Sequence, residues 1–171
     1  ESFVTGSIVT SGNPQSRGGM IGEAYGYGDG ITISNSGAQV DVADGGGLIG
    51  VVRQGTIEMT DSYAAGASNG GLIADVDNFI SLTARDTFWD NEAGSQTTAR
   101  NLGKGRSTSQ MQDVATFTNA GWAIASCIGN DCAGNTDSPV WAIRPNEYPV
   151  LCALEDDLTC SAGGSANSSA A

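Results

Sequence analysis

The sequence contains no histidine, and only 7 of its 171 residues are Lys or Arg. The absence of imidazole excludes Ser-His-Asp and Cys-His nucleophilic sites and zinc sites with His ligands. The 19 Asp and Glu residues give a net charge of −12. This charge repels nucleic acid and anionic lipid, which proteins bind through clusters of Lys and Arg. We therefore expect no nucleic-acid partner.

Long apolar runs are also missing. No segment approaches the roughly 18–20 apolar residues that a membrane-spanning helix needs, so we expect no membrane span. The opening residues 1–4, Glu-Ser-Phe-Val, have neither the basic start nor the apolar stretch of a signal peptide. The chain is therefore expected to be either a mature fragment of a longer precursor or a protein that is not secreted.

The four cysteines favour the first alternative. Four residues separate Cys127 from Cys132, and seven separate Cys152 from Cys160. Two local pairs fit two small disulfide loops in an oxidising compartment, although other connectivities and free thiols remain open. Zinc knuckles need tighter Cys-x2-Cys spacing. We therefore predict an extracellular location.

A glycine-led apolar cluster occurs three times, at residues 18–22, 46–50 and 70–74, in steps of 28 and 24 residues. A short segment of alternating polarity follows each cluster, at 31–36, 56–62 and 79–85. Such alternation is typical of short strands. The side chains expected to form the core of the repeats are Met20, Ile21, Leu48, Ile49, Ile57, Met59, Leu72, Ile73, Ile80 and Leu82.

A repeat unit of 24–28 residues cannot bury its apolar side alone, but it can do so when stacked on copies of itself. The sequence therefore predicts a mainly β fold, a right-handed parallel β-solenoid (β-helix) with a small C-terminal α+β cap held by disulfides. A β-sandwich with similar strands by coincidence is the alternative. The expected domains are the solenoid at 1–100, the cap at 101–160 and a flexible Ser/Ala/Gly tail at 161–171.

The repeat also has a family resemblance. Gly-Gly-Leu-Ile-Gly followed by Gly-Thr-Ile-x3-Asp-Ser-Tyr-Ala-Ala-Gly, at residues 46–66, resembles the GLUG motif of large bacterial surface proteins. Those proteins include adhesins of the filamentous-haemagglutinin type and some surface peptidases. Residues 18–36 and 70–90 are weaker copies, and the resemblance extends over roughly residues 2–152. It implies a structural repeat without a catalytic residue.

The C-terminal third has its own signals. Ser107 and Gln110 form a capping-box pattern that predicts a helix of about ten residues with Met111, Val114 and Phe117 on one face. We expect Trp122, Trp141 and Tyr148 to be core of the cap, with an aromatic sugar platform as the alternative. Asn167 lies in an Asn-x-Ser sequon and is a possible glycosylation site.

Acidic and amide side chains supply the candidate chemistry. Asp86, Asp90 and Glu92 form a carboxylate group of the kind that β-helical polysaccharide-degrading enzymes use, but a solvated acidic surface explains them as well. No enzyme is therefore expected, and no cofactor is predicted apart from a possible calcium ion. Its candidate oxygen ligands lie in predicted turns and are Asp75, Asp77, Asn130, Asp131 and Asp137.

The predicted function is that of an extracellular structural or adhesive module of a bacterial surface protein. The chain begins inside a repeat without a capping turn, so we expect head-to-tail self-association, which leads to a filament when the contact does not close. A monomeric adhesin domain that binds surface glycans or a host protein is the first alternative. A β-helix polysaccharide-degrading enzyme is the second.

Overall fold

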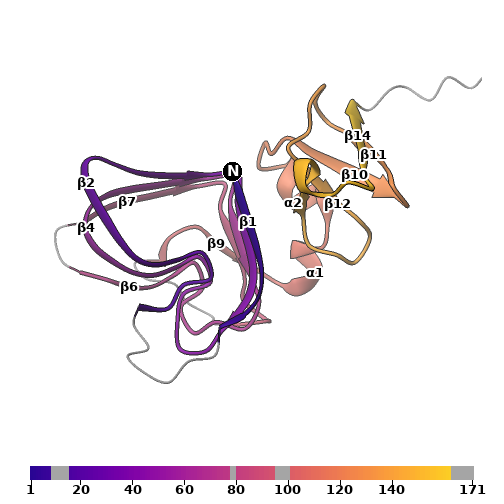
Figure 1. Ribbon diagram of the computed structural model, residues 1–171. Helices are drawn as coiled ribbons and strands as arrows, with labels where there is room; N and C mark the ends of the chain where they lie inside the picture. Colours follow the sequence, from indigo (N-terminus) through magenta and orange to yellow (C-terminus); the bar gives the residue numbers. More distant parts are fainter. Residues whose placement is uncertain (9–15, 78–79, 95–100, 163–171) are drawn as a thin grey trace, which may run out of the picture. The chain divides into compact units, whose positions relative to one another are not determined.

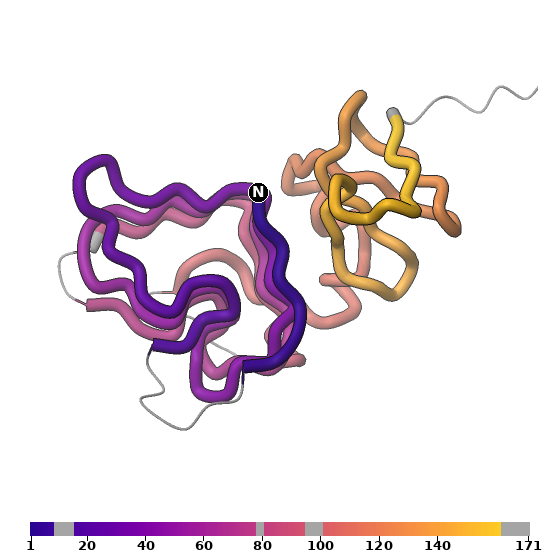
Figure 2. The backbone as a smooth tube through the Cα atoms, in the orientation of Figure 1, coloured from indigo at the N-terminus to yellow at the C-terminus, as the bar shows by residue number. Residues whose placement is uncertain are grey.

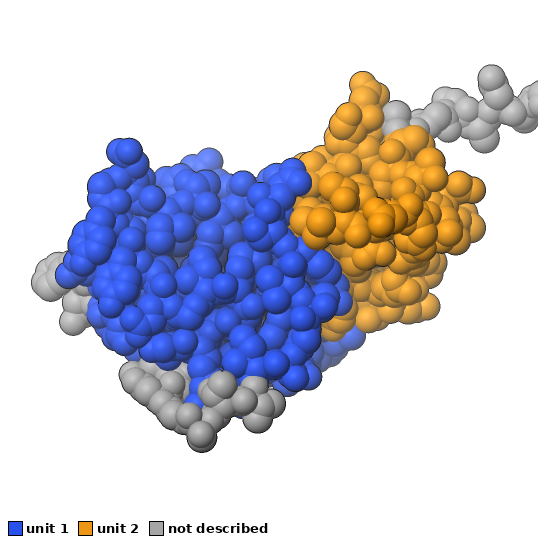
Figure 3. Space-filling model, in the orientation of Figure 1, with its two compact units in different colours: residues 1–111 blue, residues 112–171 orange. Residues whose placement is uncertain are grey.

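The computed structural model describes residues 1–8, 16–77, 80–94 and 101–162, except for the side chains of Ile80 and Ala162. The chain divides into two compact units, residues 1–111 and 112–171, which Figure 3 shows in blue and orange.

Unit 1 contains two parallel sheets. One sheet has the strand order β1-β3-β5-β8-β9, and the other has the order β2-β4-β6 with β7 beside β4. In Figures 1 and 2 successive passes of the chain lie side by side, and each pass adds strands to these sheets. The strands are β1 (Ser2–Ile8), β2 (Ile21–Ser34), β3 (Ser36–Val42), β4 (Ile49–Thr60), β5 (Tyr63–Ala65), β6 (Ile73–Val76), β7 (Ile80–Arg85), β8 (Phe88–Asp90) and β9 (Lys104–Arg106).

The fold is mainly β, but the prediction of a right-handed parallel β-solenoid is wrong. The strands form three separate sheets instead of one continuous coil. The pairing of β2 with β4 shifts register twice, between Ala24 and Tyr25 and between Gly26 and Ile31. A solenoid needs turns of matching geometry, and the uneven length of these turns breaks that match. The third sheet also contains antiparallel pairs, β10 with β11 and β12 with β13.

The glycine-led repeat nevertheless sets local register. Ile21 pairs with Ile49, and Ile49 pairs with Ile73. Of the predicted repeat-core side chains, six are fully buried: Leu48, Ile49, Ile57, Met59, Leu72 and Ile73. Three more are partly buried against the same cluster: Met20, Ile21 and Leu82. Ile80 lies in β7, and its side chain is outside the described part.

A column of left-handed residues forms one corner of unit 1. Asn35, Asp61 and Asp86 have φ values of 47°, 48° and 48°. The Asn35 N–H donates to the carbonyl before Asp61, and the Asp61 N–H donates to the carbonyl before Asp86. Each corner residue is followed by a buried Ser or Thr whose hydroxyl donates to the carbonyl two residues back. Asn and Asp suit this column because they tolerate the left-handed region better than other non-glycine residues.

Unit 2 contains the mixed sheet, in the order β13-β12-β10-β11-β14. Cys127 is bonded to Cys132 across the β10–β11 hairpin, with 4.0 Å between their Cα atoms, and Cys152 is bonded to Cys160. The elements are α2 (Val114–Thr118), β10 (Ile124–Ile128), β11 (Asp131–Gly134), β12 (Trp141–Ile143), β13 (Val150–Leu151), the 3-10 helix η3 (Cys152–Leu154) and β14 (Thr159–Ala162).

The capping box predicted at Ser107 is present. The Gln110 N–H donates to Ser107 Oγ at 3.2 Å, and the Ser107 N–H donates to the Gln110 side-chain oxygen at 3.1 Å. The prediction of a single helix of about ten residues is wrong, because the chain forms two short helices, α1 (Thr108–Met111) and then α2. Asp113 separates them, since its backbone is extended and its carboxylate accepts the Ala115 N–H as a new N-cap.

No helix in the described part of the chain is long and apolar enough to cross a membrane.

Candidate functional site

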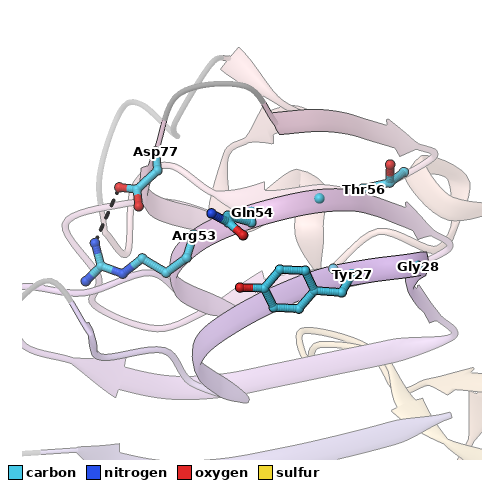
Figure 4. A pocket seen from close by; sticks show the side chains of 8 residues that line it. Tyr27, Gly28, Arg53, Gln54, Thr56 and Asp77 are labelled. Carbon is cyan, nitrogen blue, oxygen red and sulfur yellow. Dashed lines mark hydrogen bonds and ion pairs between the residues drawn. The ribbon is translucent and has the colours of Figure 1, made fainter.

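An open groove on unit 1 is the candidate site, and it lies where β2 bulges opposite β4. Gly26 pairs with Gly55 and Ile31 pairs with Ile57, so residues 27–30 lie opposite the single residue Thr56. Of these extra residues, Tyr27 and Gly28 line the groove beside β4 (Figure 4). β4 and Asp77 form the rest, and the groove has a volume of about 650 Å³.

Two glycines make this bulge possible. Gly55 has φ +92°, and a Cβ placed there would lie 1.6 Å from the carbonyl oxygen of Gly26. A Cβ on Gly26 would lie 2.5 Å from the carbonyl oxygen of Thr56. The backbones of β2 and β4 therefore approach each other at a distance that only glycine allows.

Two tyrosines on β2 are the exposed aromatic side chains of this region. Tyr25 is 47% exposed and Tyr27 is 66% exposed. Their ring centroids are 6.0 Å apart and their planes differ by 11°. Because they are two residues apart on one strand, they project from the same face. Large aromatic rings are usually buried in a monomer, so this pair marks a surface that is suited to binding.

An ion-pair network borders the tyrosines. The two terminal nitrogens of Arg53 contact different carboxylates, Glu23 and Asp77, each at 3.3 Å. Glu23 also accepts hydrogen bonds from the Ser16 hydroxyl at 2.5 Å and from the Tyr25 hydroxyl at 3.2 Å. The hydrogen bond from Ser16, followed by that from Arg53, lowers the pKa of Glu23. The negative charge of Glu23, followed by its hydrogen bond with the phenol, raises the pKa of Tyr25.

Arg53 is thereby fixed in place. Its hydrogen bond to Glu23 is the main reason that its pKa is raised, and its side chain is 27% exposed. Figure 4 shows the guanidinium turned toward Asp77, away from the ring of Tyr27. The exposed amide of Gln54, which can both donate and accept hydrogen bonds, lies between them on β4.

Comparison with known proteins gives a distant relative. The chain is 34% identical over 129 residues, 70% of its length, to a protein of Evansella cellulosilytica named "Putative Gly-rich membrane protein". The aligned part spans 12% of that relative's length. No protein-family model matches the chain, and no solved structure matches it.

Two of the residues predicted to bind calcium, Asp75 and Asp77, contact other groups of the protein. The described part of the chain contains no group of three or more acidic or cysteine side chains placed to hold a metal ion. The Asp75 carboxylate accepts the N–H of Val76, and Asp77 pairs with Arg53. The other three candidates, Asn130, Asp131 and Asp137, belong to unit 2.

The carboxylates considered for an enzyme have structural contacts. Asp90 is 2% exposed, and it accepts the backbone N–H groups of Glu92 and Ala93 and the hydroxyl of Thr108. Glu92 accepts the N–H of Thr108 at 2.9 Å. Together they join the end of β8 to the first residue of α1.

The prediction that Trp122 and Trp141 are core of the cap is confirmed, which contradicts their alternative role in an exposed sugar platform, whereas Tyr148 is half-buried. Trp122 and Trp141 are fully buried, and their ring centroids are 5.2 Å apart. Trp122 also packs on Phe117 with a centroid distance of 4.8 Å. Asn167, the predicted glycosylation site, lies outside the described residues.

Sequence reasoning missed Tyr25, Tyr27 and Arg53. The available signal was the longer first repeat, whose step of 28 residues exceeds the following step of 24. Part of this excess lies at residues 27–30, within the segment Tyr-Gly-Tyr-Gly-Asp-Gly at 25–30, which combines aromatic residues with glycines.

Proposed function

We propose that this chain is an extracellular adhesive module of a bacterial surface protein and that it binds saccharides through the groove beside Tyr25 and Tyr27. The observation that carries the proposal is the exposed, nearly parallel tyrosine pair, of which Tyr27 lines an open groove. The flat face of an aromatic ring packs against the C–H groups of a sugar. The exposed Gln54 amide and the Thr56 hydroxyl, which line the groove with Tyr27, are polar groups that suit sugar hydroxyls.

Other features support the extracellular part of the proposal. Two disulfides in a unit of this size are typical of proteins outside the reducing cytosol. The relative from Evansella cellulosilytica is named a membrane protein. The GLUG resemblance is consistent with a module repeated along a surface protein. Contacts at an open groove that are individually weak gain strength through avidity when the module is repeated along a surface protein.

The test is a depletion assay with suspended cellulose and chitin. We expect the protein to bind at least one of them, and we expect Tyr27→Ala to weaken that binding about tenfold or more, because an aromatic contact worth about 1.4 kcal/mol corresponds to a factor of ten. Tyr27→Phe keeps the ring and is expected to retain most of the binding. Ile128→Ala is the matched control, since Ile128 is 86% exposed and lies in unit 2. Equal loss in Tyr27→Ala and Ile128→Ala would refute a role for the groove.

Two earlier expectations stay predictions. Head-to-tail self-association is tested by electron microscopy of the full chain at increasing concentration, where filaments are the expected result. Calcium binding is tested by the melting temperature with and without added calcium, and an unchanged value would contradict it.

A further inference from the structure

We infer that the groove selects uncharged saccharide chains over acidic ones, and that Glu23 and Asp77 set this preference by holding Arg53. The inference rests on the proposed function and specifies its ligand class. Proteins recognise acidic sugars through an Arg or Lys whose charge is available to the sugar carboxylate or sulfate. The contacts of Arg53 remove that possibility here.

The charge balance of the groove is negative. Among the described residues that line it, Arg53 is the one cation, and its two terminal nitrogens contact Glu23 and Asp77. Two carboxylates around one guanidinium leave a local charge of about −1. Asp29, which is exposed on the bulge beside Tyr27, adds a further negative charge. An approaching anionic chain is therefore repelled, and it cannot pair with Arg53 without displacing an existing partner.

The remaining polar groups suit a neutral chain. The Gln54 amide and the Thr56 hydroxyl lie on β4 beside Tyr27 and are uncharged (Figure 4). Each can donate to or accept from a sugar hydroxyl. A ring face, an amide and a hydroxyl together fit the alternating C–H faces and hydroxyl edges of a neutral hexose chain.

The experiment compares the retention of the full chain on a neutral polysaccharide (cellulose), an acidic one (polygalacturonate) and a cationic polymer (polylysine). We expect wild type to bind cellulose and to leave polygalacturonate unbound. The double variant Glu23→Gln/Asp77→Asn releases Arg53, and we expect its retention on polygalacturonate to rise at least tenfold. Adding Arg53→Gln to this variant is expected to abolish the gain.

The matched control is Asp137→Asn/Asp156→Asn, which removes the same number of charges from exposed positions of unit 2. If retention on polygalacturonate rises as much in this control as in the groove variant, the inference is overturned, because the change in net charge alone would then explain the increase. Circular dichroism verifies the fold of each variant. A folded groove variant without any gain would also overturn it.

The outcomes distinguish a failure of the inferred ligand class from a failure of the proposed function. Wild-type binding to polygalacturonate that equals binding to cellulose and depends on Tyr27 would overturn the ligand class and leave the proposed function standing. Binding to polylysine alone would overturn both, because the chain, with its net charge of −12, would then bind a polycation and neither polysaccharide of this comparison. Binding to neither chitin nor any of these three polymers would overturn the proposed function itself. Binding to cellulose or chitin that does not depend on Tyr27 would overturn it as well.

Discussion

Replacing Asp61 by Asn is expected to stabilise the protein at neutral pH. Asp61 lies in the corner column between Asn35 and Asp86, with φ 48°. Burial raises the pKa of Asp61, and the negative charge of Asp86 raises it further. Asn keeps the shape and the tolerance of the left-handed region, as Asn35 already demonstrates one corner away, but it removes the charge.

The magnitude follows from the stacking of the corners. Neighbouring strands are ~4.8 Å apart, and two like charges at that distance repel by about 0.8 kcal/mol in bulk water. Like charges opposite each other on adjacent strands typically cost roughly 0.2–1 kcal/mol. We therefore expect Asp61→Asn to raise the free energy of unfolding by about 0.5–1 kcal/mol at pH 7. For a chain of this length this corresponds to a melting temperature about 1–4 °C higher.

The stabilisation by Asp61→Asn must depend on pH. Because the pKa of Asp61 is higher in the folded than in the unfolded chain, where it is near 3.8, the ionised side chain destabilises the fold above the folded pKa. Below pH 3.8 Asp61 is protonated in both states and this cost disappears. The difference between Asp61→Asn and wild type is therefore expected to be largest at pH 7 and close to zero at pH 3.

Urea denaturation at both pH values, in low salt, measures the difference. Asp61→Ala is the control, because alanine lacks the charge but resists positive φ by about 1–2 kcal/mol; it should be less stable than Asp61→Asn. A double-mutant cycle with Asp86→Asn should show that the two gains overlap instead of adding. An Asp61→Asn protein that is no more stable than wild type at pH 7, or equally stabilised at pH 3, would refute the reasoning.

Three further predictions concern the bulge, the Asp90 contacts and the disulfides. Gly55→Ala is expected to destabilise unit 1 by about 2 kcal/mol or more and to weaken saccharide binding, because its Cβ would collide with the Gly26 carbonyl. Urea denaturation and the cellulose assay test this, and an unchanged free energy of unfolding with unchanged cellulose binding would contradict the close approach of the two backbones. Asp90→Asn should cost about 1–3 kcal/mol of unfolding free energy, since it weakens hydrogen bonds at a buried carboxylate; a folded variant of wild-type stability would show that these bonds contribute little. Replacing Cys152 and Cys160 together by Ala should cost about 2.5 kcal/mol of unfolding free energy, which is the chain-entropy value for so short a loop. Urea denaturation of wild type with and without reductant should show a loss of stability at least as large, and insensitivity to reductant would argue against this contribution.

The local features of the fold followed from the sequence alone. The glycine-led repeats placed Ile21, Ile49 and Ile73 in register, and the capping box at Ser107 formed as expected. Both depend on residues a few positions apart or on apolar periodicity, which local geometry and burial dictate. The preferred cysteine pairing rested on short loops in the same way.

The tertiary structure decided how the turns fit together. Apolar alternation identifies strands but not the sheet to which each belongs, so it could not show three separate sheets. The break at Asp113 was hidden because helix periodicity continues through it, whereas the extended backbone and the new N-cap end the first helix. The candidate site likewise depends on how the passes of the chain pair with one another. Tyr27, Arg53 and Asp77 come from three passes of the chain, and only the register of β2 against β4 brings them to one groove.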